Sequence, residues 1–210
     1  MIPVKICGIT SLKDAIMAAN YGASALGFIF YKNSPRYIAP QLLKTWISKL
    51  PSNLKKVGVF VNKGVDKVNK IAGDLNLDMV QLHGDESPEY CNQMIKPVTK
   101  VFKVNNEFDP TVLNDYPVSA FLFDTYKKES YGGTGESFDW QSISNLDTEI
   151  PIILSGGLNA ENILEGIKVV MPSAVDVNSG VESEPGVKDA EKVKYFFTRL
   201  ENIEGNGELF

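Results

Sequence analysis

Eight short apolar runs, separated by segments with helical spacing, constrain the fold of this chain more than any other feature of its sequence. The runs cover residues 4–7, 25–30, 57–61, 79–82, 98–104, 120–123, 150–154 and 174–177. They are rich in Val, Ile and Phe, as expected of strands that are buried on both faces. A strand followed by a helix, repeated eight times, predicts a parallel sheet with helical crossovers and therefore a single-domain (β/α)8 TIM barrel. An open doubly wound sheet is the alternative, but no GxGxxG motif follows the first run, as a dinucleotide-binding version would require.

The segments between the runs have the apolar spacing of helices of one to four turns. They cover residues 14–21, 40–50, 65–75, 88–95, 109–116, 138–146, 160–170 and 188–202, of which 109–116 is the weakest. Pro40 suits the first turn of the second helix. Ser87 and Asn159 are expected to cap the fourth and seventh helices, and Asp189 is expected in the first turn of the eighth.

The length of the chain fits a small barrel. Its 210 residues leave about 26 residues for each β/α unit, whereas barrels of this kind typically have about 250 residues in all, so the size is near-minimal. We assign residues 1–202 to the barrel and expect the polar, Gly-rich residues 203–210 to form a disordered C-terminal tail. Little chain remains for a second domain.

Composition and charge exclude several classes of protein. The net charge of −5, from 21 Lys and Arg against 26 Asp and Glu, argues against a nucleic-acid partner. Cys7 and Cys91 are too few for a disulfide framework, and the single histidine, His83, leaves too few ligands for a zinc site. The N-terminus lacks the apolar region of a signal peptide, and no apolar run approaches the length of a membrane span. We expect a cytoplasmic protein without a metal, in which Cys91 packs in the core.

Polar side chains occur where several of the predicted strands end. They are Lys5, Cys7, Gln81, His83, Asp124 and Asp176. In a barrel, functional residues lie at the carboxyl ends of the strands, so these side chains are expected to converge at one rim. Side chains alternate along a strand, which places Lys5 and Cys7 on the same face. Each of these residues also has a structural interpretation: a lone cysteine or histidine at a strand end is more often structural, and Lys5 could simply pair with Asp176.

Three Gly-containing loops are expected at the same rim. They are Gly132-Gly133-Thr134-Gly135, Ser155-Gly156-Gly157-Leu158 and Asn178-Ser179-Gly180, after the sixth, seventh and eighth strands. Barrels frequently bind phosphate with the loops after strands seven and eight, where glycines let backbone N–H groups approach the oxygens. A Gly-Gly pair between strand and helix is often only a turn. The prediction of a phosphate site therefore depends on the combination rather than on any one loop.

Ten motifs occur in order along nearly the whole chain, and together they are far more specific than any one of them. They are Lys5-Ile6-Cys7-Gly8-Ile9-Thr10, Gly27-Phe28-Ile29-Phe30, Ser34-Pro35-Arg36-Tyr37-Ile38, Gly58-Val59-Phe60-Val61-Asn62, Val80-Gln81-Leu82-His83-Gly84, Phe123-Asp124-Thr125, Tyr131-Gly132-Gly133-Thr134-Gly135, Phe138-Asp139-Trp140, Leu154-Ser155-Gly156-Gly157-Leu158 and Val175-Asp176-Val177-Asn178-Ser179-Gly180-Val181-Glu182. At these spacings the chain resembles the phosphoribosylanthranilate isomerases, the Amadori-rearranging barrel enzymes of tryptophan biosynthesis. The resemblance implies an aldose–ketose isomerase that needs no cofactor and no metal.

The resemblance also implies a reaction and roles for individual residues. The enzyme would convert N-(5-phosphoribosyl)anthranilate to 1-(2-carboxyphenylamino)-1-deoxyribulose 5-phosphate, with Cys7 as general base and Asp124 as general acid. Arg36 would hold the anthranilate carboxylate, and His83 and Asp176 would orient the substrate. The phosphate would lie on the loops after strands seven and eight, at Gly156, Gly157, Ser179 and Gly180.

A base and an acid both need tuned protonation. A free cysteine has a pKa near 8.5, which leaves only a few per cent thiolate at pH 7, and a nearby cation lowers that pKa. Lys5 is expected on the same strand face, and our hypothesis is that it helps to keep Cys7 ionised. An aspartate that acts as an acid must hold its proton near neutral pH, which burial or a shared proton achieves.

Two other functions remain open from the sequence. One is another phosphate-binding barrel isomerase or lyase, which would usually carry two carboxylates or a lysine as its acid–base pair. The other is a non-catalytic barrel that binds a phosphometabolite. The presence of both Cys7 and Asp124 favours the isomerase. We expect a small phosphoribosyl substrate and a monomer, with neither a nucleic acid nor a membrane as partner.

Overall fold

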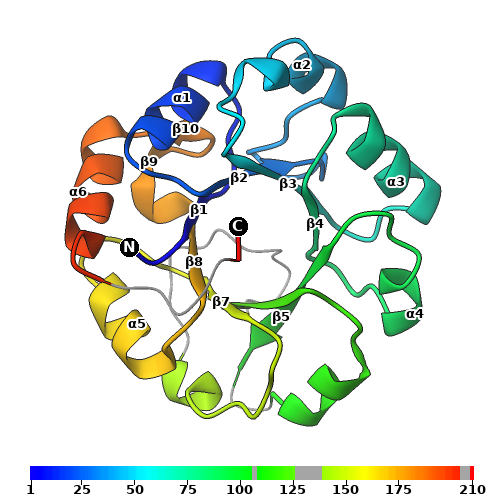
Figure 1. Cartoon of the computed structure of the whole chain (residues 1–210), viewed down its shortest axis with the longest axis vertical. Helices are drawn as coiled ribbons and strands as arrows, with labels where there is room; N and C mark the ends of the chain where they lie inside the picture. The colour runs from blue at the N-terminus through cyan, green and yellow to red at the C-terminus, as the bar shows by residue number, and fades with distance from the viewer. Residues whose placement is uncertain (106–107, 126–138, 204–208) are drawn as a thin grey trace.

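A closed ring of eight parallel strands, surrounded by helices, forms the computed structural model of this chain (Figure 1). The structure describes residues 1–105, 108–125, 139–203 and 209–210. Each strand pairs with the next one in sequence, and β8 pairs with β1, where Lys5 lies opposite Asp176. The predicted (β/α)8 barrel is therefore confirmed.

Every predicted apolar run is a strand of the barrel. The strands are β1 (Val4–Ile6), β2 (Ala25–Ile29), β3 (Lys55–Phe60), β4 (Met79–Leu82), β5 (Val98–Val104), β6 (Ala120–Thr125), β7 (Ile152–Leu154) and β8 (Ala174–Val177). Most of their residues are buried, because alternate side chains point either to the helices or into the ring. This double burial is what made the runs visible as continuous apolar stretches.

Most of the helices are shorter than the sequence predicts, whereas the first one begins two residues earlier than predicted, at Leu12. The α-helices are α1 (Leu12–Asn20), α2 (Pro40–Lys44), α3 (Val65–Asp74), α4 (Pro88–Cys91), α5 (Ile163–Val170) and α6 (Ala190–Leu200), and the 3-10 helices are η1 (Ile47–Lys49), η2 (Pro110–Asp115), η3 (Trp140–Ile143) and η4 (Ser179–Val181). The predicted helix 40–50 is thus wrong as one element: it divides after Lys44, where the Thr45 hydroxyl donates to the carbonyl of Leu42.

Two predicted helices, 109–116 and 138–146, are 3-10 turns instead. In η2 the only buried apolar residue is Leu113, too few for the apolar stripe that stabilises an α-helix. In η3 the buried residues are Trp140 and Ile143, whose spacing of three suits the three residues per turn of a 3-10 helix. Phe138, where the second prediction begins, lies outside the described residues.

The predicted helix caps have different outcomes. Ser87 caps α4 as predicted, with its Oγ accepting from the backbone N–H of Tyr90 at 3.3 Å. Asn159 instead caps a short turn, accepting from the N–H groups of Glu161 and Asn162, and α5 begins only at Ile163. Asp189 is the N-cap of α6 rather than a residue of its first turn. Both differences arise because a capping side chain, which accepts from the free N–H groups at the start of a turn or helix, lies just before the first turn rather than in it.

A short hairpin between β8 and α6 is absent from the sequence prediction. Its strands are β9 (Glu182–Glu184) and β10 (Val187–Lys188), paired antiparallel. The prediction that a helix begins at Lys188 is therefore wrong. The turn contains Pro185 and then Gly186, which has φ = +88°, a conformation that glycine adopts without strain. Pro-Gly is a recognised turn signal and would have indicated this hairpin.

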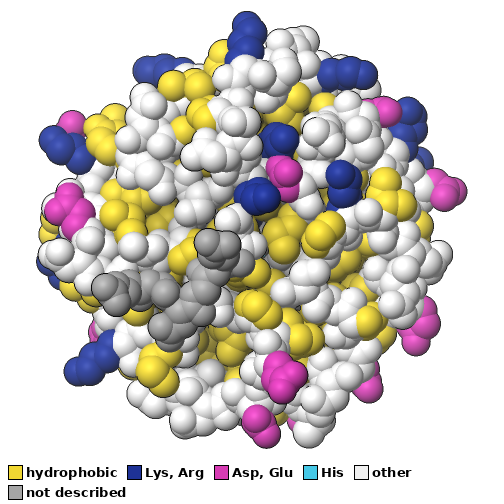
Figure 2. Space-filling view, viewed as in Figure 1, with side chains coloured by type: hydrophobic (Ala, Val, Ile, Leu, Met, Phe, Trp, Pro, Cys, Tyr) yellow, Lys and Arg dark blue, Asp and Glu magenta, His cyan; other side chains and the backbone are white. Residues whose placement is uncertain are grey.

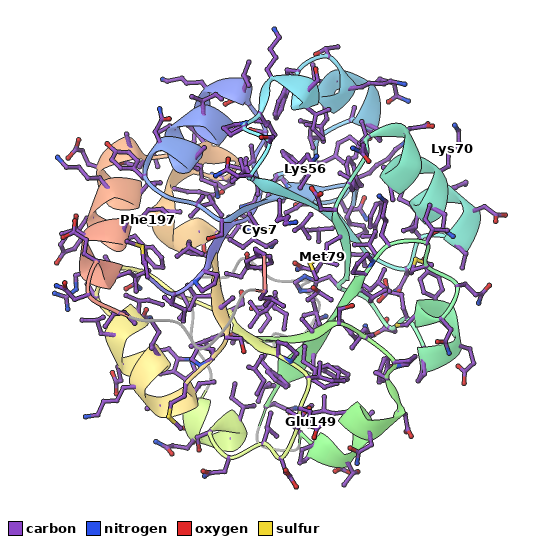
Figure 3. The ribbon with its side chains drawn as sticks, in the orientation of Figure 1. Cys7, Lys56, Lys70, Met79, Glu149 and Phe197 are labelled. Carbon is purple, nitrogen blue, oxygen red and sulfur yellow. The ribbon has the colours of Figure 1, made fainter. Side chains whose placement is uncertain are left out.

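The side chains form an outer apolar shell and a mixed interior. In Figure 3, Phe197 lies between α6 and the ring of strands, Lys70 points away from the molecule, and Cys7 lies inside the ring. Cys91 is buried in the outer core, as expected. Within the described residues, no helix is both long enough and apolar enough to cross a membrane.

The end of the chain covers the opening of the ring at the amino-terminal ends of the strands. Phe210 is half-buried and packs against Ala25, Val57 and Met79, which lie near the starts of β2, β3 and β4. Accordingly, the C-terminus lies at the centre of the ring in Figure 1. Residues 204–208 lie outside the described residues, so the disordered tail stays a prediction for them. Figure 2 shows charged side chains of both signs distributed over the face drawn there.

Candidate functional site

A cavity of about 360 Å³ opens at the carboxyl ends of the strands. It is lined by Cys7, Ile29, Tyr31, Asn33, Ser34, Pro35, Arg36, Val59, Val61, Gln81, His83, Asp124, Ser155, Gly156, Gly157, Leu158, Asp176, Asn178 and Ser179. All the predicted site residues except Gly180 are in this lining. The prediction that polar strand ends converge at one rim therefore agrees with the structure.

Gly180 has a packing role instead. A Cβ atom at this position would collide with the backbone carbonyl of Leu158. The absence of a side chain lets the loop after β8 lie directly against the loop after β7. Gly180 therefore brings together the two loops predicted to hold phosphate, although it does not itself line the cavity.

Cys7 follows β1 and is almost fully buried, with 4% of its surface exposed. The neighbouring position on β2 is Gly27. A Cβ atom there would lie 2.7 Å from Cys7 Sγ and 3.0 Å from Lys5 Nζ. Gly27 therefore leaves the space in which the ammonium group of Lys5 and the thiol of Cys7 lie together.

Lys5 and Asp176 form a buried ion pair below Cys7. Lys5 Nζ donates to Asp176 Oδ1 at 2.7 Å, and the two side chains are 1% and 5% exposed. Ser155 Oγ lies 3.4 Å from the other carboxylate oxygen, Asp176 Oδ2. Burial acts to lower the pKa of Lys5, but Asp176 and Cys7 together raise it above its ordinary value. Lys5 is therefore held as a cation beside the thiol.

The pKa of Cys7 shifts in the direction opposite to the one that Lys5 alone would give. Burial raises the pKa of the Cys7 thiol and outweighs Lys5, which lowers it; Asp176 raises it further. The net direction is upward. Lys5 therefore acts on Cys7 in the direction that our hypothesis gives, but desolvation is the larger effect and decides the net direction.

Replacing Lys5 tests this balance. In Lys5→Met we expect the alkylation of Cys7 by iodoacetamide to slow at least several-fold at neutral pH, because loss of the cation raises the pKa of the thiol still further. Alkylation rates measured against pH by mass spectrometry give the result. A Cys91→Ser background leaves Cys7 as the only cysteine.

A second variant is expected to change the alkylation rate of Cys7 in the opposite direction. Asp176 raises the pKa of Cys7, so Asp176→Asn should speed alkylation where Lys5→Met slows it. A change in accessibility alone would not shift the pH profile in opposite directions. Identical profiles in wild type and Lys5→Met would remove Lys5 from control of the thiol.

Asp124 lies on β6 with its carboxylate at the edge of the cavity. Its Oδ1 accepts from the backbone N–H of Thr125 at 2.8 Å, and its Oδ2 lies 3.3 Å from His83 Nε2. A Cβ atom at Gly156, which has φ = +83°, would lie 3.1 Å from Asp124 Oδ1. The loop after β7 thus closes over this carboxylate because it carries no side chain there.

His83 is oriented by its neighbour on β4. Gln81 Nε2 lies 3.4 Å from His83 Nδ1, and both side chains are buried. If the amide donates, the ring proton of a neutral His83 is on Nε2, the atom that faces Asp124. The arrangement therefore brings together the predicted acid and one predicted substrate-orienting residue.

A second buried ion pair fixes the loop that follows His83. Lys100 Nζ donates to the carbonyl of Gly84 at 2.6 Å and to Glu86 Oε2 at 3.1 Å. Glu86 also accepts from the N–H groups of Asn62 and Gly84, at 2.8 and 2.9 Å. This network ties the loops after β3 and β4 together. The network is not evident from the sequence, because an acidic residue in a turn is ordinarily solvated.

Arg36 is held at the cavity wall by a third group of buried charges. Its guanidinium donates to both carboxylate oxygens of Glu182, and Lys188 Nζ donates to the same carboxylate at 2.8 Å. The three side chains are each at least nine-tenths buried. Arg36 was predicted, whereas Glu182 was not assigned a role and Lys188 was placed at a helix start.

The loops after β7 and β8 contribute two glycines, Gly156 and Gly157, and Ser179 to the cavity lining. Gly156 and Gly157 have φ values of +83° and +68°, and Ser179 begins the 3-10 helix η4. Successive N–H groups in such conformations form a concave surface that suits an anion. The third predicted loop, 132–135, lies outside the described residues.

Comparison with known proteins gives one consistent family. A sequence profile described as N-(5'phosphoribosyl)anthranilate (PRA) isomerase matches residues 4–199. The N-(5'-phosphoribosyl)anthranilate isomerase of Geobacter sp. (strain M21) is 47% identical over 203 residues, covering 97% of this chain and 100% of that protein.

Solved structures lead to the same family. The phosphoribosyl anthranilate isomerase of Thermus thermophilus has a TM-score of 0.89 at 37% identity, covering 97% of this chain and 100% of that one. Another phosphoribosyl anthranilate isomerase, solved in complex with reduced 1-(o-carboxyphenylamino)-1-deoxyribulose 5-phosphate, has a TM-score of 0.82 at 37% identity, with coverage of 97% and 100%.

Proposed function

The chain belongs to the N-(5'-phosphoribosyl)anthranilate isomerase family, and from this premise we propose that Cys7 and Asp124 carry out the proton transfers of its reaction. The protein is the isomerase of tryptophan biosynthesis that converts N-(5-phosphoribosyl)anthranilate to 1-(2-carboxyphenylamino)-1-deoxyribulose 5-phosphate. The conversion is an Amadori rearrangement, in which an aldose derivative becomes a ketose derivative. Acid–base catalysis is what it needs from the protein.

Two proton transfers drive the rearrangement. Asp124 donates a proton to the furanose ring oxygen, the bond from that oxygen to C1 breaks, and the nitrogen lone pair forms a Schiff base. Cys7 then removes the proton from C2, which gives an enolamine that tautomerises to the ketone. C1 is reduced as C2 is oxidised, so the electrons stay within the substrate. Each well-placed acid or base typically contributes about 10²–10⁴-fold to the rate.

The observation that supports these roles most is the placement of the two residues in one cavity. Cys7 follows β1 and Asp124 lies on β6, so β7 and β8 separate them in the ring. A sugar bound across the cavity can thus meet an acid and a base from different sides. Arg36 and the loops after β7 and β8 lie in the same lining and suit the two anionic groups of the substrate.

The test of the function is direct conversion of the substrate. We expect wild-type protein to turn N-(5-phosphoribosyl)anthranilate into the ketose product, measured by chromatography of both compounds. Other phosphorylated pentoses serve as comparison substrates. Binding without conversion would favour a non-catalytic barrel, and conversion of a different sugar phosphate alone would favour another isomerase.

Arg36→Ala tests the carboxylate contact. We expect KM to rise about 10–100-fold with a smaller change in kcat, because a hydrogen bond to a charged group contributes about 1.5–3 kcal/mol and the contact is far from the reacting carbons. Steady-state kinetics measures both constants. An unchanged KM would mean that Arg36 does not contact the substrate.

The remaining expectations concern the setting of the enzyme. We propose a cytoplasmic protein with no nucleic-acid or membrane partner and with neither cofactor nor metal. These expectations rest on the composition and on the proton-transfer chemistry of the reaction.

A further inference from the structure

We propose that Glu182 is a positioning residue that fixes which edge of the Arg36 guanidinium faces the substrate, and so determines how strongly the enzyme selects a carboxylate at the ortho position of the aromatic ring. The inference deepens the proposed function and rests on the proposed contact between Arg36 and the substrate carboxylate. It concerns Glu182 and the hairpin β9–β10, to which the sequence analysis assigned no role.

Glu182 occupies one defined edge of the guanidinium. Arg36 Nε lies 3.0 Å from both Glu182 Oε1 and Oε2, and Arg36 Nη2 lies 2.7 Å from Oε2. This is the side edge, formed by Nε and Nη2. The contact is bidentate and buried, with side-chain exposures of 8% and 4%. Such a pair restricts rotation of the guanidinium plane much more than a single hydrogen bond does.

The donors that remain define what the cavity can bind. A guanidinium has five N–H donors, two on Nη1, two on Nη2 and one on Nε. With Nε and one Nη2 hydrogen used by Glu182, the end edge remains, with parallel donors on Nη1 and Nη2. Arg36 lines the cavity, so this end edge is the part available to a ligand there. Two parallel donors match a carboxylate in a second bidentate contact.

Glu182 is in turn held on its other side. Lys188 Nζ donates to Glu182 Oε1 at 2.8 Å, and the Gly186 N–H donates to the same oxygen at 3.2 Å. Lys188 Nζ also donates to Asn178, at 3.1 Å to its carbonyl and 3.0 Å to its Oδ1. The hairpin β9–β10 therefore holds the carboxylate of Glu182 in a fixed position against Arg36.

The aliphatic part of Arg36 is also confined. Gly8, with φ = +73°, lies beside it, and a Cβ atom there would be 2.8 Å from Arg36 Cδ and 2.6 Å from Asn178 Oδ1. The side chain thus passes through a gap that only glycine leaves open. Both ends of Arg36 are therefore fixed before any substrate binds, which lowers the entropic cost of binding.

The charges of this cluster indicate an anionic ligand. Arg36 and Lys188 bring two positive charges into direct contact with one carboxylate, that of Glu182. Asp14 is also buried nearby, but its carboxylate faces the backbone N–H of Lys188 rather than the ammonium group. One substrate carboxylate on the end edge of Arg36 would balance the excess positive charge. A buried cation is stable only when it is paired in this way.

The experiment measures selection of the carboxylate directly. Two ligands are compared by calorimetry: reduced 1-(o-carboxyphenylamino)-1-deoxyribulose 5-phosphate and the same compound made from aniline, which lacks the carboxylate. The dissociation constant of the aniline compound divided by that of the carboxylate compound is the carboxylate selectivity. We expect Glu182→Gln to lower this ratio about tenfold while the affinity for the aniline compound changes less than about twofold, because the neutral amide no longer makes the charge-assisted bidentate contact that holds the guanidinium plane. This loss of orientation outweighs the attraction added when the cluster loses one negative charge.

Matched variants separate positioning from a structural effect. Glu184→Gln changes an exposed residue of the same hairpin and should leave the ratio unchanged. Glu182→Asp keeps the charge but withdraws it by one methylene, and should also lower the ratio; it replaces Glu182→Gln if that variant does not fold. Equal weakening of both ligands in the Glu182 variants would overturn the inference, since it would show a general loss of structure.

Arg36→Ala distinguishes this inference from the proposal on which it rests. Loss of selectivity in both Arg36→Ala and the Glu182 variants supports both. Loss in Arg36→Ala with full selectivity in the Glu182 variants leaves the role of Arg36 intact and overturns that of Glu182. Full selectivity in Arg36→Ala would overturn both, because the carboxylate would then bind elsewhere.

Discussion

Cys7→Ser is expected to lower kcat by about 10²–10⁴-fold, which corresponds to about 3–5 kcal/mol of lost transition-state stabilisation. Serine has nearly the size of cysteine, but its hydroxyl is far less acidic than a thiol and does not supply a base. The backbone N–H of Cys7 donates to the carbonyl of Val177, and the substitution leaves that bond intact. We therefore expect folding and KM to change little, measured by circular dichroism and steady-state kinetics.

The chain provides a matched control for this substitution. Cys91 is also buried, but it lies at the end of α4 and packs in the outer apolar core, away from the cavity. Cys91→Ser should keep wild-type kcat. Near-normal turnover in Cys7→Ser would exclude Cys7 from the mechanism, and an equal loss in both variants would indicate damage to the fold.

The pH dependence of kcat/KM is a second test of Cys7 as the general base. Since burial places the pKa of Cys7 above its ordinary value, few molecules of the free enzyme hold a thiolate at neutral pH. A base must be deprotonated to act, so kcat/KM in the wild type should still rise with pH on the alkaline side of neutrality. The residual activity of Cys7→Ser should lack that rise.

The barrel was predictable because its strands are buried on both faces. Runs such as 79–82 and 174–177 are buried along their whole length, so the strands coincide in the sequence and the structure. The barrel closure also followed from the count of eight units, since each crossover is right-handed and adds one strand to the same edge. Helix ends were less predictable, because a cap such as Asn159 can satisfy a turn instead of a helix.

The candidate site was only partly predictable from the sequence. Residues at strand ends were found because the barrel places all carboxyl ends at one rim, which is how Cys7 and Asp124 were identified. Glu182 and Lys188 were not found, since Glu182 contacts Arg36 across 146 positions of the chain and Lys188 contacts Glu182 through a hairpin that the pattern did not show. Side-chain pairing of this kind depends on tertiary geometry, which no local spacing encodes.

The pKa of Cys7 shows a further limit of the sequence. The sequence shows Lys5 two residues before Cys7, and a nearby cation is expected to lower the pKa of the thiol. The sequence does not show how deeply the thiol is buried, and this burial decides the net direction of the pKa shift. A full account of a catalytic thiol therefore needs the cavity as well as the neighbouring charge.

Asp124→Asn is expected to lower kcat by about 10²–10⁴-fold as well, because an amide keeps the shape of the carboxyl group but transfers no proton. Asparagine Oδ1 can still accept from the Thr125 N–H, as Asp124 Oδ1 does at 2.8 Å. The backbone at the end of β6 should therefore keep its conformation. We expect ring opening to become the slow step, since the leaving ring oxygen is no longer protonated. Single-turnover kinetics with N-(5-phosphoribosyl)anthranilate measures this step apart from product release.

Two comparisons decide whether Asp124 is the acid. Asp124→Asn should bind reduced 1-(o-carboxyphenylamino)-1-deoxyribulose 5-phosphate with nearly wild-type affinity, because that ligand has an open chain and needs no ring protonation. Asp66→Asn, at an exposed position of α3, should keep full kcat. If Asp124→Asn instead lost ligand affinity in proportion to kcat, Asp124 would be a binding group, and His83, 3.3 Å away, would become the candidate acid. The two alternatives thus differ in a single measured ratio, that of ligand affinity to turnover.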